Sequence, residues 1–169
     1  GRTARGVKSM NLRDGDQLVS MDVLTSELVE QLSVLNQTNN DTNDDSEDDL
    51  LDGPWVLVAS SFGLGKRVPV TQFRLQKRAG MGLKAIKFRI SNDVLVGLKV
   101  LGKGEEILLV TEKGVIVRTN ADKISQQSRA ATGVKLQKLD EGDHLAEIVL
   151  VPHEQIDDEN IEHVDNNQK

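Results

Sequence analysis

The chain has 169 residues, contains neither cysteine nor tyrosine, and carries a formal net charge of −6. Without cysteine it can form neither a disulfide framework nor a thiolate metal site, which fits a reducing compartment or simply a cysteine-free module. No apolar run approaches the ~20 residues that a membrane-spanning helix requires, and the first residues lack a signal-peptide pattern. We therefore expect one domain, or a piece of a larger protein, without a membrane segment.

The negative net charge conceals a partition of charge along the chain. Residues 54–138 carry 16 lysines and arginines against 5 acidic residues, a net charge of +11, whereas residues 14–53 carry 12 acidic residues and no basic one. Residues 139–169 carry 10 acidic residues and a single lysine. Because ordinary surfaces mix the two signs, a basic block of domain size favours a nucleic-acid partner. A merely solvated basic surface is the alternative.

A short basic motif, called the box below, occurs three times in the chain. It consists of an arginine, three further residues, a glycine, an aliphatic residue and a lysine. Its copies lie at residues 2–8, 78–84 and 129–135. After an insertion is subtracted, the copies recur about every 50 residues, which is typical of propeller-like repeats. Residues 1–25, which include the first box, are predicted to be the end of a preceding blade.

Two acidic stretches are predicted to lie outside the folded units. Residues 26–53 form a flexible insertion, in which Leu28, Val29, Leu32 and Leu35 have the spacing of a short amphipathic helix. The polar and acidic remainder of this insertion cannot bury enough apolar surface to fold. Residues 152–169 are expected to be a disordered acidic tail. Both stretches would either compete with a nucleic acid for the basic surface or serve as solubilising spacers.

Two complete units, at residues 54–101 and 102–151, are predicted to be blades of about four antiparallel strands. Strands are expected at 55–59, 66–70, 84–90 and 94–101 in the first unit, and at 107–111, 115–119, 134–139 and 145–151 in the second. Valine, isoleucine and leucine dominate these runs and long helical periodicity is missing, so the fold class is all-β. Because repeat folds usually stack about three or more units, we expect a partial ring.

The chain offers no catalytic constellation. The run Gly-Leu-Gly-Lys at 63–66 lacks the other positions of a phosphate-binding loop. His144, His153 and His163 have neither metal-ligand spacing nor a nearby nucleophile. The absence of tyrosine leaves any tyrosine nucleophile to another part of the protein. We therefore expect a non-catalytic chain with no metal ion or other cofactor of its own.

The basic residues are predicted to bind the backbone of a nucleic-acid duplex. Arginine and lysine at regular intervals bind phosphates with little sequence preference. Three of the four aromatic residues lie in apolar strand contexts and no helix can read the major groove, which argues against base stacking and base readout. A curved surface of blades would bend the duplex. The candidate phosphate contacts are Arg2, Arg5, Lys8, Lys66, Arg67, Arg74, Lys77, Arg78, Lys84, Arg118, Arg129 and Lys135.

Several of these motifs resemble the C-terminal domain of the A subunit of DNA gyrase. They are the boxes, Gly-Lys-Arg-Val-Pro at 65–69, Thr-Glu-Lys-Gly-Val-Ile-Val-Arg-Thr at 111–119 and Leu-Asp-Glu-Gly-Asp at 139–143. The resemblance implies a β-pinwheel whose basic rim wraps duplex DNA for ATP-dependent negative supercoiling. It also implies a link to the rest of the A subunit, which assembles with the B subunit into an A2B2 heterotetramer that uses ATP and Mg²⁺ elsewhere. A cytoplasmic location in a bacterium, or a plastid location, follows from the same resemblance.

One motif departs from this family. The full family box reads Gln-Arg-Arg-Gly-Gly-Lys-Gly, whereas residues 76–82 read Gln-Lys-Arg-Ala-Gly-Met-Gly. We therefore expect the chain to hold the last blades of such a domain, with the full box upstream. Two alternatives stay open: the DNA-binding C-terminal domain of topoisomerase IV, which shares the blades but lacks the full box, and a propeller module for protein–protein interaction.

Overall fold

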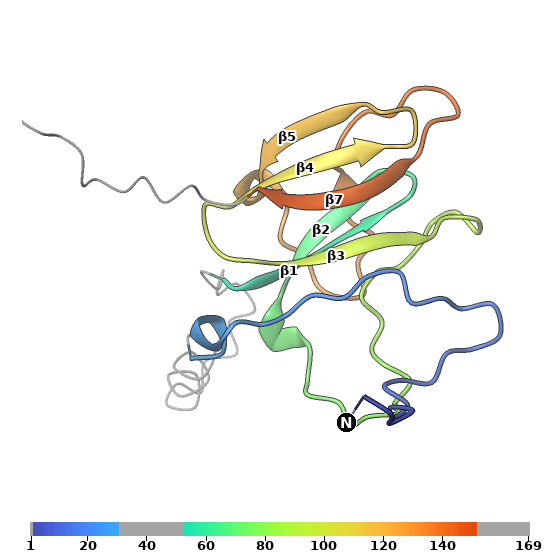
Figure 1. The fold of residues 1–169 in the computed structure, drawn as a ribbon. Coiled ribbons are helices and arrows are strands. Elements are labelled where there is room, and N and C mark those ends of the chain that lie inside the picture. The colour runs from blue at the N-terminus through green and yellow to red at the C-terminus, as the bar shows by residue number, and fades with distance from the viewer. Residues whose placement is uncertain (1, 31–52, 152–169) are drawn as a thin grey trace, which may run out of the picture.

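The computed structural model describes residues 2–30 and 53–151, and the regular secondary structure of this part is almost entirely β-strand (Figure 1). This confirms the predicted all-β class. The strands are β1 (Trp55–Ser60), β2 (Leu64–Pro69), β3 (Leu95–Leu101), β4 (Glu106–Thr111), β5 (Ile116–Asn120), β6 (Val134–Lys135) and β7 (Leu145–Val151). Two 3-10 turns follow the hairpins, η1 (Val70–Gln72) and η2 (Ala121–Lys123). No helix among the described residues has the length and apolar character needed to cross a bilayer.

The strands form two antiparallel sheets built on one plan. Strand β1 lies between β2 and β3, and strand β4 lies between β5 and β7. Both central strands shift register at the same place, between Ala59 and Ser60 in β1 and between Val110 and Thr111 in β4. A turn glycine with positive φ, Gly63 or Gly114, follows each central strand and permits the tight hairpin. Residues 54–101 and 102–151 therefore repeat the same local structure.

The fourth strand of the first sheet comes from the second unit. Strand β6 pairs with β2, with Leu64 opposite Lys135 and Gly65 opposite Val134, which gives the order β3-β1-β2-β6. The prediction that residues 134–139 form a strand within their own unit is therefore wrong. The strand predicted at 84–90 is absent from the described structure. The end of the third box thus pairs with the preceding unit, whereas the described residues before 53 contain no strand with which residues 84–90 could pair.

The hydrophobic core lies between the two sheets. Its buried members are Leu57, Ala59, Leu101, Ile107, Leu109, Ala121, Ile124, Leu145 and Ile148. Side chains alternate between the two faces of a strand, so every second side chain of β1 and β4 points into this layer. Burial of each leucine or isoleucine contributes about 1.5–3 kcal/mol to stability. Because both sheets share one core, neither unit buries its apolar face without the other.

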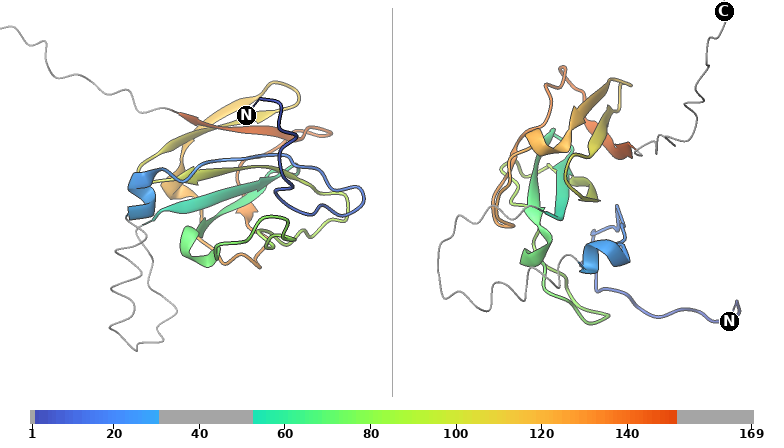
Figure 2. Two further views of the ribbon diagram at one scale, coloured as in Figure 1. Left: turned by 60° about the horizontal axis from the view of Figure 1, so that its bottom comes forward. Right: turned by 90° about the vertical axis from the view of Figure 1, so that its left-hand side faces the viewer.

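The N-terminal segment crosses the molecule beside strand β3 and ends in a helical turn at residues 26–30 (Figures 1 and 2). The Ser20 hydroxyl donates to the carbonyl of Leu98 at 3.3 Å, and the Val100 N–H donates to Asp22 at 2.8 Å. The Thr25 hydroxyl accepts from the Leu28 N–H and caps the helical turn. The remainder of the predicted acidic insertion, 31–52, and the predicted tail, 152–169, lie outside the described residues.

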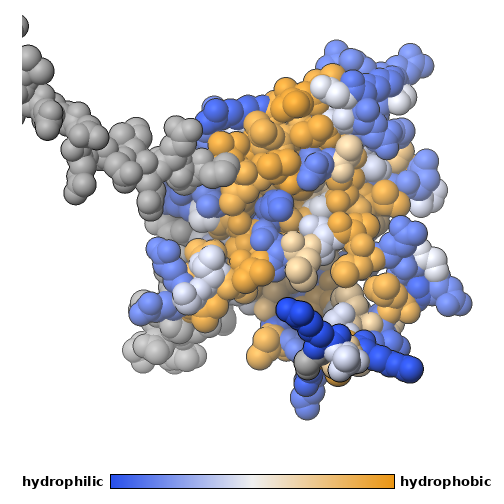
Figure 3. Space-filling view, viewed as in Figure 1, coloured by the Kyte–Doolittle hydropathy of each residue, from blue (hydrophilic) through white to orange (hydrophobic). Residues whose placement is uncertain are grey.

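The apolar residues of this N-terminal segment are not part of the core. Leu18, Met21 and Val23 are exposed by 66%, 80% and 67%. Figure 3 shows hydrophobic side chains gathered on the face of the molecule that carries β3 and β7, with hydrophilic side chains at its edges. The segment is therefore attached to the described fold through backbone and polar contacts rather than by burial.

A buried carboxylate fastens each hairpin to the last strand of its unit. Asp93 accepts from the Ser61 hydroxyl at 2.9 Å and from the Phe62 N–H at 3.2 Å. Asp143 holds the equivalent place in the second unit and accepts from the N–H groups of Lys113 and His144. Burial alone would raise the pKa of Asp143, but hydrogen bonds from Thr111, Lys113 and His144 and the Lys113 charge outweigh it and lower that pKa.

Replacing Asp143 by asparagine is expected to destabilise the protein more at pH 7 than at pH 3. A carboxyl whose pKa is lowered by folding stabilises the native state above its unfolded pKa, about 4, and loses that effect as the pH falls through its folded value. Urea unfolding of wild type and Asp143→Asn at both pH values measures the difference. Asp140→Asn removes an exposed carboxylate of the same loop and serves as the control. A difference that stays constant with pH would contradict the assignment.

Candidate nucleic-acid interface

The three boxes lie one after another along the molecule. The first and second are joined where Asn11 N–H donates to the carbonyl of Gly80 and Ala79 N–H donates to the carbonyl of Ser9, each at 2.8 Å. The second and third are joined where Lys87 N–H donates to the carbonyl of Ala131 at 3.1 Å. In Figure 1 the N-terminal residues accordingly lie beside the loop that precedes β3. Motifs far apart in the sequence thus form a continuous series.

The basic residues of the boxes are exposed along this series, and we call them the basic track. The track consists of Arg2, Arg5, Lys8, Arg78, Lys84, Arg129 and Lys135; all are exposed except Arg129, which is half-buried. Arg74 and Lys77, which lead into the second box, are exposed as well. Nine predicted contacts therefore lie on neighbouring segments. Eight of these side chains are exposed to a ligand, and that of Arg129 is partly exposed.

Arg129 is the most firmly held member of the basic track. Its guanidinium lies 5.9 Å from the centroid of the Phe73 ring and donates to the carbonyl of Lys84 at 3.1 Å. Its backbone N–H donates to the side chain of Gln72 at 3.1 Å. A cation above an aromatic face is stabilised by the ring quadrupole, so Arg129 is oriented at the junction of the second and third boxes.

Lys66 is a predicted phosphate contact, but the structure buries it. Its side chain is 0% exposed, and Nζ donates to three main-chain carbonyls, those of Ser128 at 2.6 Å, Arg129 at 2.8 Å and Ala131 at 2.7 Å. Burial and the charge of Arg129 lower the pKa of Lys66 to about 8. All donors of the ammonium are used inside the protein, so Lys66 is removed from the candidate contacts.

Arg67 is also internal and is removed for the same reason. Its guanidinium donates to the carboxylate of Asp122 at 2.8 Å and to the carbonyl of Ile124 at 2.9 Å, and it stacks 4.4 Å from the centroid of the Trp55 ring. Gln126 completes this cluster by accepting from the Trp55 indole N–H at 2.7 Å. The cluster links strand β2 to the segment after η2 and leaves only 10% of the Arg67 side chain exposed.

Arg118 lies apart from the boxes, on strand β5. Its side chain is 61% exposed, and Nε donates to Glu106 on the neighbouring strand β4 at 2.9 Å. Exposed pairs of this kind contribute only about 0–1 kcal/mol, so the guanidinium can exchange this partner for a phosphate. The structure does not bring Arg118 to the basic track.

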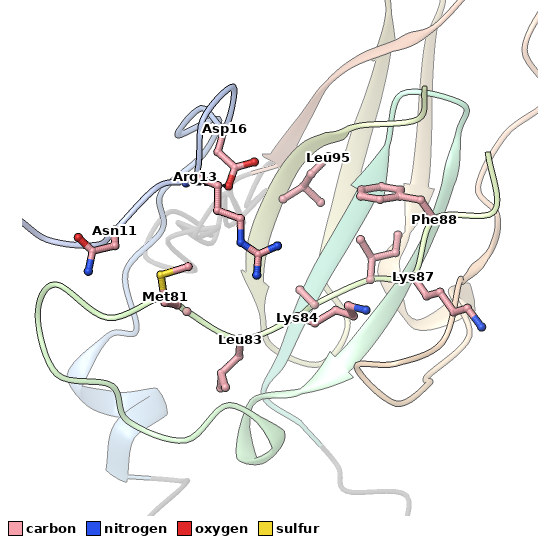
Figure 4. Close-up of a pocket in the computed structure, with 12 residues that line it drawn as sticks. Asn11, Arg13, Asp16, Met81, Leu83, Lys84, Lys87, Phe88 and Leu95 are labelled. Carbon is pink, nitrogen blue, oxygen red and sulfur yellow. Dashed lines mark hydrogen bonds between the residues drawn. The ribbon is translucent and has the colours of Figure 1, made fainter. Parts of the chain in front are cut away.

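Two further basic side chains, Arg13 and Lys87, are absent from the predicted contacts. Together with Asp16, they line a groove of about 710 Å³ between the N-terminal segment and residues 81–88. Figure 4 shows Arg13 extending from the N-terminal segment toward the strip that carries Met81 and Leu83. Both basic residues lie within five positions of the end of a box. This proximity is the only feature of the sequence that could have added them to the candidate contacts.

The groove corresponds to the position that a hairpin turn occupies in the first unit. In the first unit the turn around Gly63 lies between Asp93 and the segment that carries Gln137 and Leu139. Asp16 and Phe88 hold the matching positions at the groove, yet no hairpin of the described residues fills it. Asp16 instead accepts from the Arg13 N–H at 3.2 Å. We therefore do not count the groove itself as part of the interface.

The geometry of the basic track supports anion binding. Within residues 2–30 and 53–151, no group of three histidine, cysteine or acidic residues is placed to hold a metal ion. The basic track supplies guanidinium and ammonium donors on adjoining segments. Arginine can bind a phosphate with two parallel hydrogen bonds, and lysine binds it as a point charge.

Comparison with known proteins relates the chain to gyrase. A family model described as "DNA gyrase C-terminal domain, beta-propeller" matches residues 1–25, 54–101 and 105–152. The DNA gyrase A subunit of Synechocystis sp. is 46% identical over 158 residues, which cover 90% of this chain and 18% of that protein. The DNA gyrase A subunit of Staphylococcus epidermidis is 37% identical over 154 residues, which cover 91% of this chain and 15% of that protein. The chain thus spans less than a fifth of the length of these relatives.

Solved structures give the same relationship. A structure of a DNA gyrase A C-terminal domain superposes with a TM-score of 0.54 and 28% identity, covering 60% of this chain and 34% of that chain. The C-terminal domain of a topoisomerase IV superposes with the same TM-score at 24% identity, covering 63% and 32%; this likeness shows the fold alone. The resemblance to gyrase found in the boxes is confirmed, and the chain belongs to the family of DNA gyrase C-terminal domains with a β-propeller fold.

Proposed function

We propose that the chain binds duplex DNA along the basic track and wraps it as the C-terminal part of a DNA gyrase A subunit. The observation that carries this proposal is the hydrogen-bonded succession of the three boxes, which sets their exposed basic residues on neighbouring segments. A duplex laid across successive boxes meets, at each of them, a basic side chain that can donate hydrogen bonds to its phosphates. Contacts of this kind hold DNA without reading its sequence.

The proposal assigns the chemistry of supercoiling to other parts of the enzyme. Strand cleavage would lie in the remainder of the A subunit, whereas ATP and Mg²⁺ would be used with the B subunit. The function of this chain is then to bend DNA, whose bending energy of several kcal/mol the phosphate contacts must offset. A location with the bacterial or plastid chromosome follows from this assignment.

Binding of a 40-bp duplex is expected to weaken steeply with salt. Each released counterion contributes about −0.9 to the slope of log affinity against log salt, so six contacts lower the affinity about 10³-fold between 50 and 200 mM salt. Fluorescence anisotropy measures the slope, and energy transfer between dyes at the two DNA ends should rise as the duplex bends. Binding that is absent or insensitive to salt would contradict the proposal and favour a protein partner instead.

A further inference from the structure

We propose that Lys66 is a positioning residue for DNA binding: it holds the turn at residues 128–131 in the shape that presents Arg129 to the phosphate backbone. The inference rests on the proposed function, because it concerns how one member of the basic track is held in place. It assigns a role to a buried lysine that the DNA itself does not reach.

The three acceptors of Lys66 belong to a single turn. The carbonyls of Ser128, Arg129 and Ala131 converge on Nζ at 2.6–2.8 Å. An ammonium group has three N–H donors, so the turn takes all of them. Three carbonyl oxygens that point to one spot repel each other unless a cation lies between them. The lysine therefore determines which conformation this turn adopts.

The outer side of the same turn is fastened by neutral groups. The N–H groups of Arg129 and Gly133 donate to the side chains of Gln72 and Gln127, each at 3.1 Å. The Ala131 N–H donates back to the carbonyl of Ser128 at 3.1 Å. With its carbonyls bound to Lys66 inside and its N–H groups bound outside, the turn has a fixed direction, and the side chain of Arg129 leaves it over the Phe73 ring.

Comparison of the two sheets supports a role tied to the box. The two hairpins have matching registers, and the residue equivalent to Lys66 in strand β5 is Val117. Within the described residues, strand β2 pairs with a box strand while the outer edge of β5 pairs with none. A lysine is thus found on the strand against which a box docks, and an apolar residue on the strand that lacks one.

The contact also crosses between repeats. Lys66 lies on β2 of the first unit, whereas its acceptors belong to the second unit, 62 to 65 positions later. Loss of the ammonium should therefore leave both sheets folded and free the turn at their junction. Arg129 would then lose the fixed position from which it also donates to the carbonyl of Lys84.

The test is a double-mutant cycle between Lys66→Met and Arg129→Ala. Lys66→Met keeps a long side chain and removes the donors. Each single variant is expected to lower the affinity for a 40-bp duplex about fivefold to tenfold at 100 mM salt, the contribution of about one phosphate contact. The double variant should bind no more weakly than Arg129→Ala alone, because Lys66 acts through Arg129. Hydrogen exchange should become faster at residues 129–133 but not in β1 or β4.

Controls separate this role from general destabilisation. Leu57→Ala opens a cavity in the core between the sheets and should leave DNA affinity unchanged at temperatures where the protein is folded. Lys66→Gln, which retains two donors, replaces Lys66→Met if that variant does not fold. If Lys66→Met lowers DNA affinity equally in the wild-type and Arg129→Ala backgrounds, or in neither, the inference is overturned. DNA binding by the wild-type protein, and with it the proposed function, would still stand. Failure of wild type to bind would overturn the proposed function itself.

Discussion

Replacing Gly133 by alanine is expected to lower the free energy of unfolding by about 2–5 kcal/mol and to detach strand β6 from β2. Gly133 has a φ of +95°, which disfavours any residue with a Cβ. An added Cβ would also lie 2.6 Å from the carbonyl oxygen of Gly65 and 2.8 Å from its carbonyl carbon. The obstructing atoms belong to the backbone of a paired strand, so they cannot rotate away.

The matched control for this variant is Gly114→Ala. Gly114 has a similar φ of +85°, but an added Cβ meets nothing within 4 Å. Its cost should be the backbone strain alone, about 1–2 kcal/mol. Urea unfolding gives the two stabilities, and hydrogen exchange at the Leu136 N–H, which donates to the carbonyl of Gly63, reports the release of the box. A cost for Gly133→Ala no larger than that of Gly114→Ala would show that the close approach of the two strands is unimportant.

Removing four positive charges from the basic track is expected to lower DNA affinity about 10³-fold at 100 mM salt. The variant combines Arg78→Ala, Lys84→Ala, Arg129→Ala and Lys135→Ala. Each lost phosphate contact should also reduce the salt slope by about 0.9, which gives a total change of about 3.6. Three of these residues are exposed and Arg129 is half-buried, so the substitutions leave the core between the sheets intact.

A variant with the same change in net charge distinguishes contact from general attraction. It combines Lys99→Ala, Lys103→Ala, Lys113→Ala and Lys123→Ala, all outside the boxes. Long-range attraction is screened beyond about 10 Å at this salt concentration, so its affinity should fall far less. Equal losses for the two variants would mean that charge alone, and not the succession of boxes, governs binding.

Most of the strands can be predicted from local sequence. Strand β7 is expected at 145–151 and observed at Leu145–Val151, and β4 is expected at 107–111 and observed at Glu106–Thr111. Runs rich in aliphatic residues and bounded by a turn glycine, Gly114 after β4 and Gly142 before β7, leave few alternatives. The partner of β6 cannot be found in this way, because periodicity does not report which distant strand pairs with which. That pairing depends on two glycines, 65 and 133, which approach each other only in the folded chain.

The candidate site is predicted less well from the sequence, and Lys66 shows why. A Lys-Arg pair just after a hairpin turn usually lies on the surface, which favours a ligand contact for both residues. Their hydrogen-bond partners lie between residues 122 and 131, which the sequence gives no means of placing. One signal is available. Residues alternate in a strand, and Lys66 shares its face with Leu64 and Val68, a sign of burial that requires a special partner.

Strand β6 belongs to the second unit but completes the sheet of the first unit. The unit that repeats in the sequence is therefore not the unit that folds. A fragment cut at the repeat boundary, after residue 101, would keep β1, β2 and β3 but lose the strand that completes their sheet and every acceptor of Lys66. A fragment that starts at residue 102 would carry a box with nothing to dock against. Gain or loss of a repeat during the history of such a protein therefore has to preserve the joint between neighbours, and the length of the array is changed most safely at its ends.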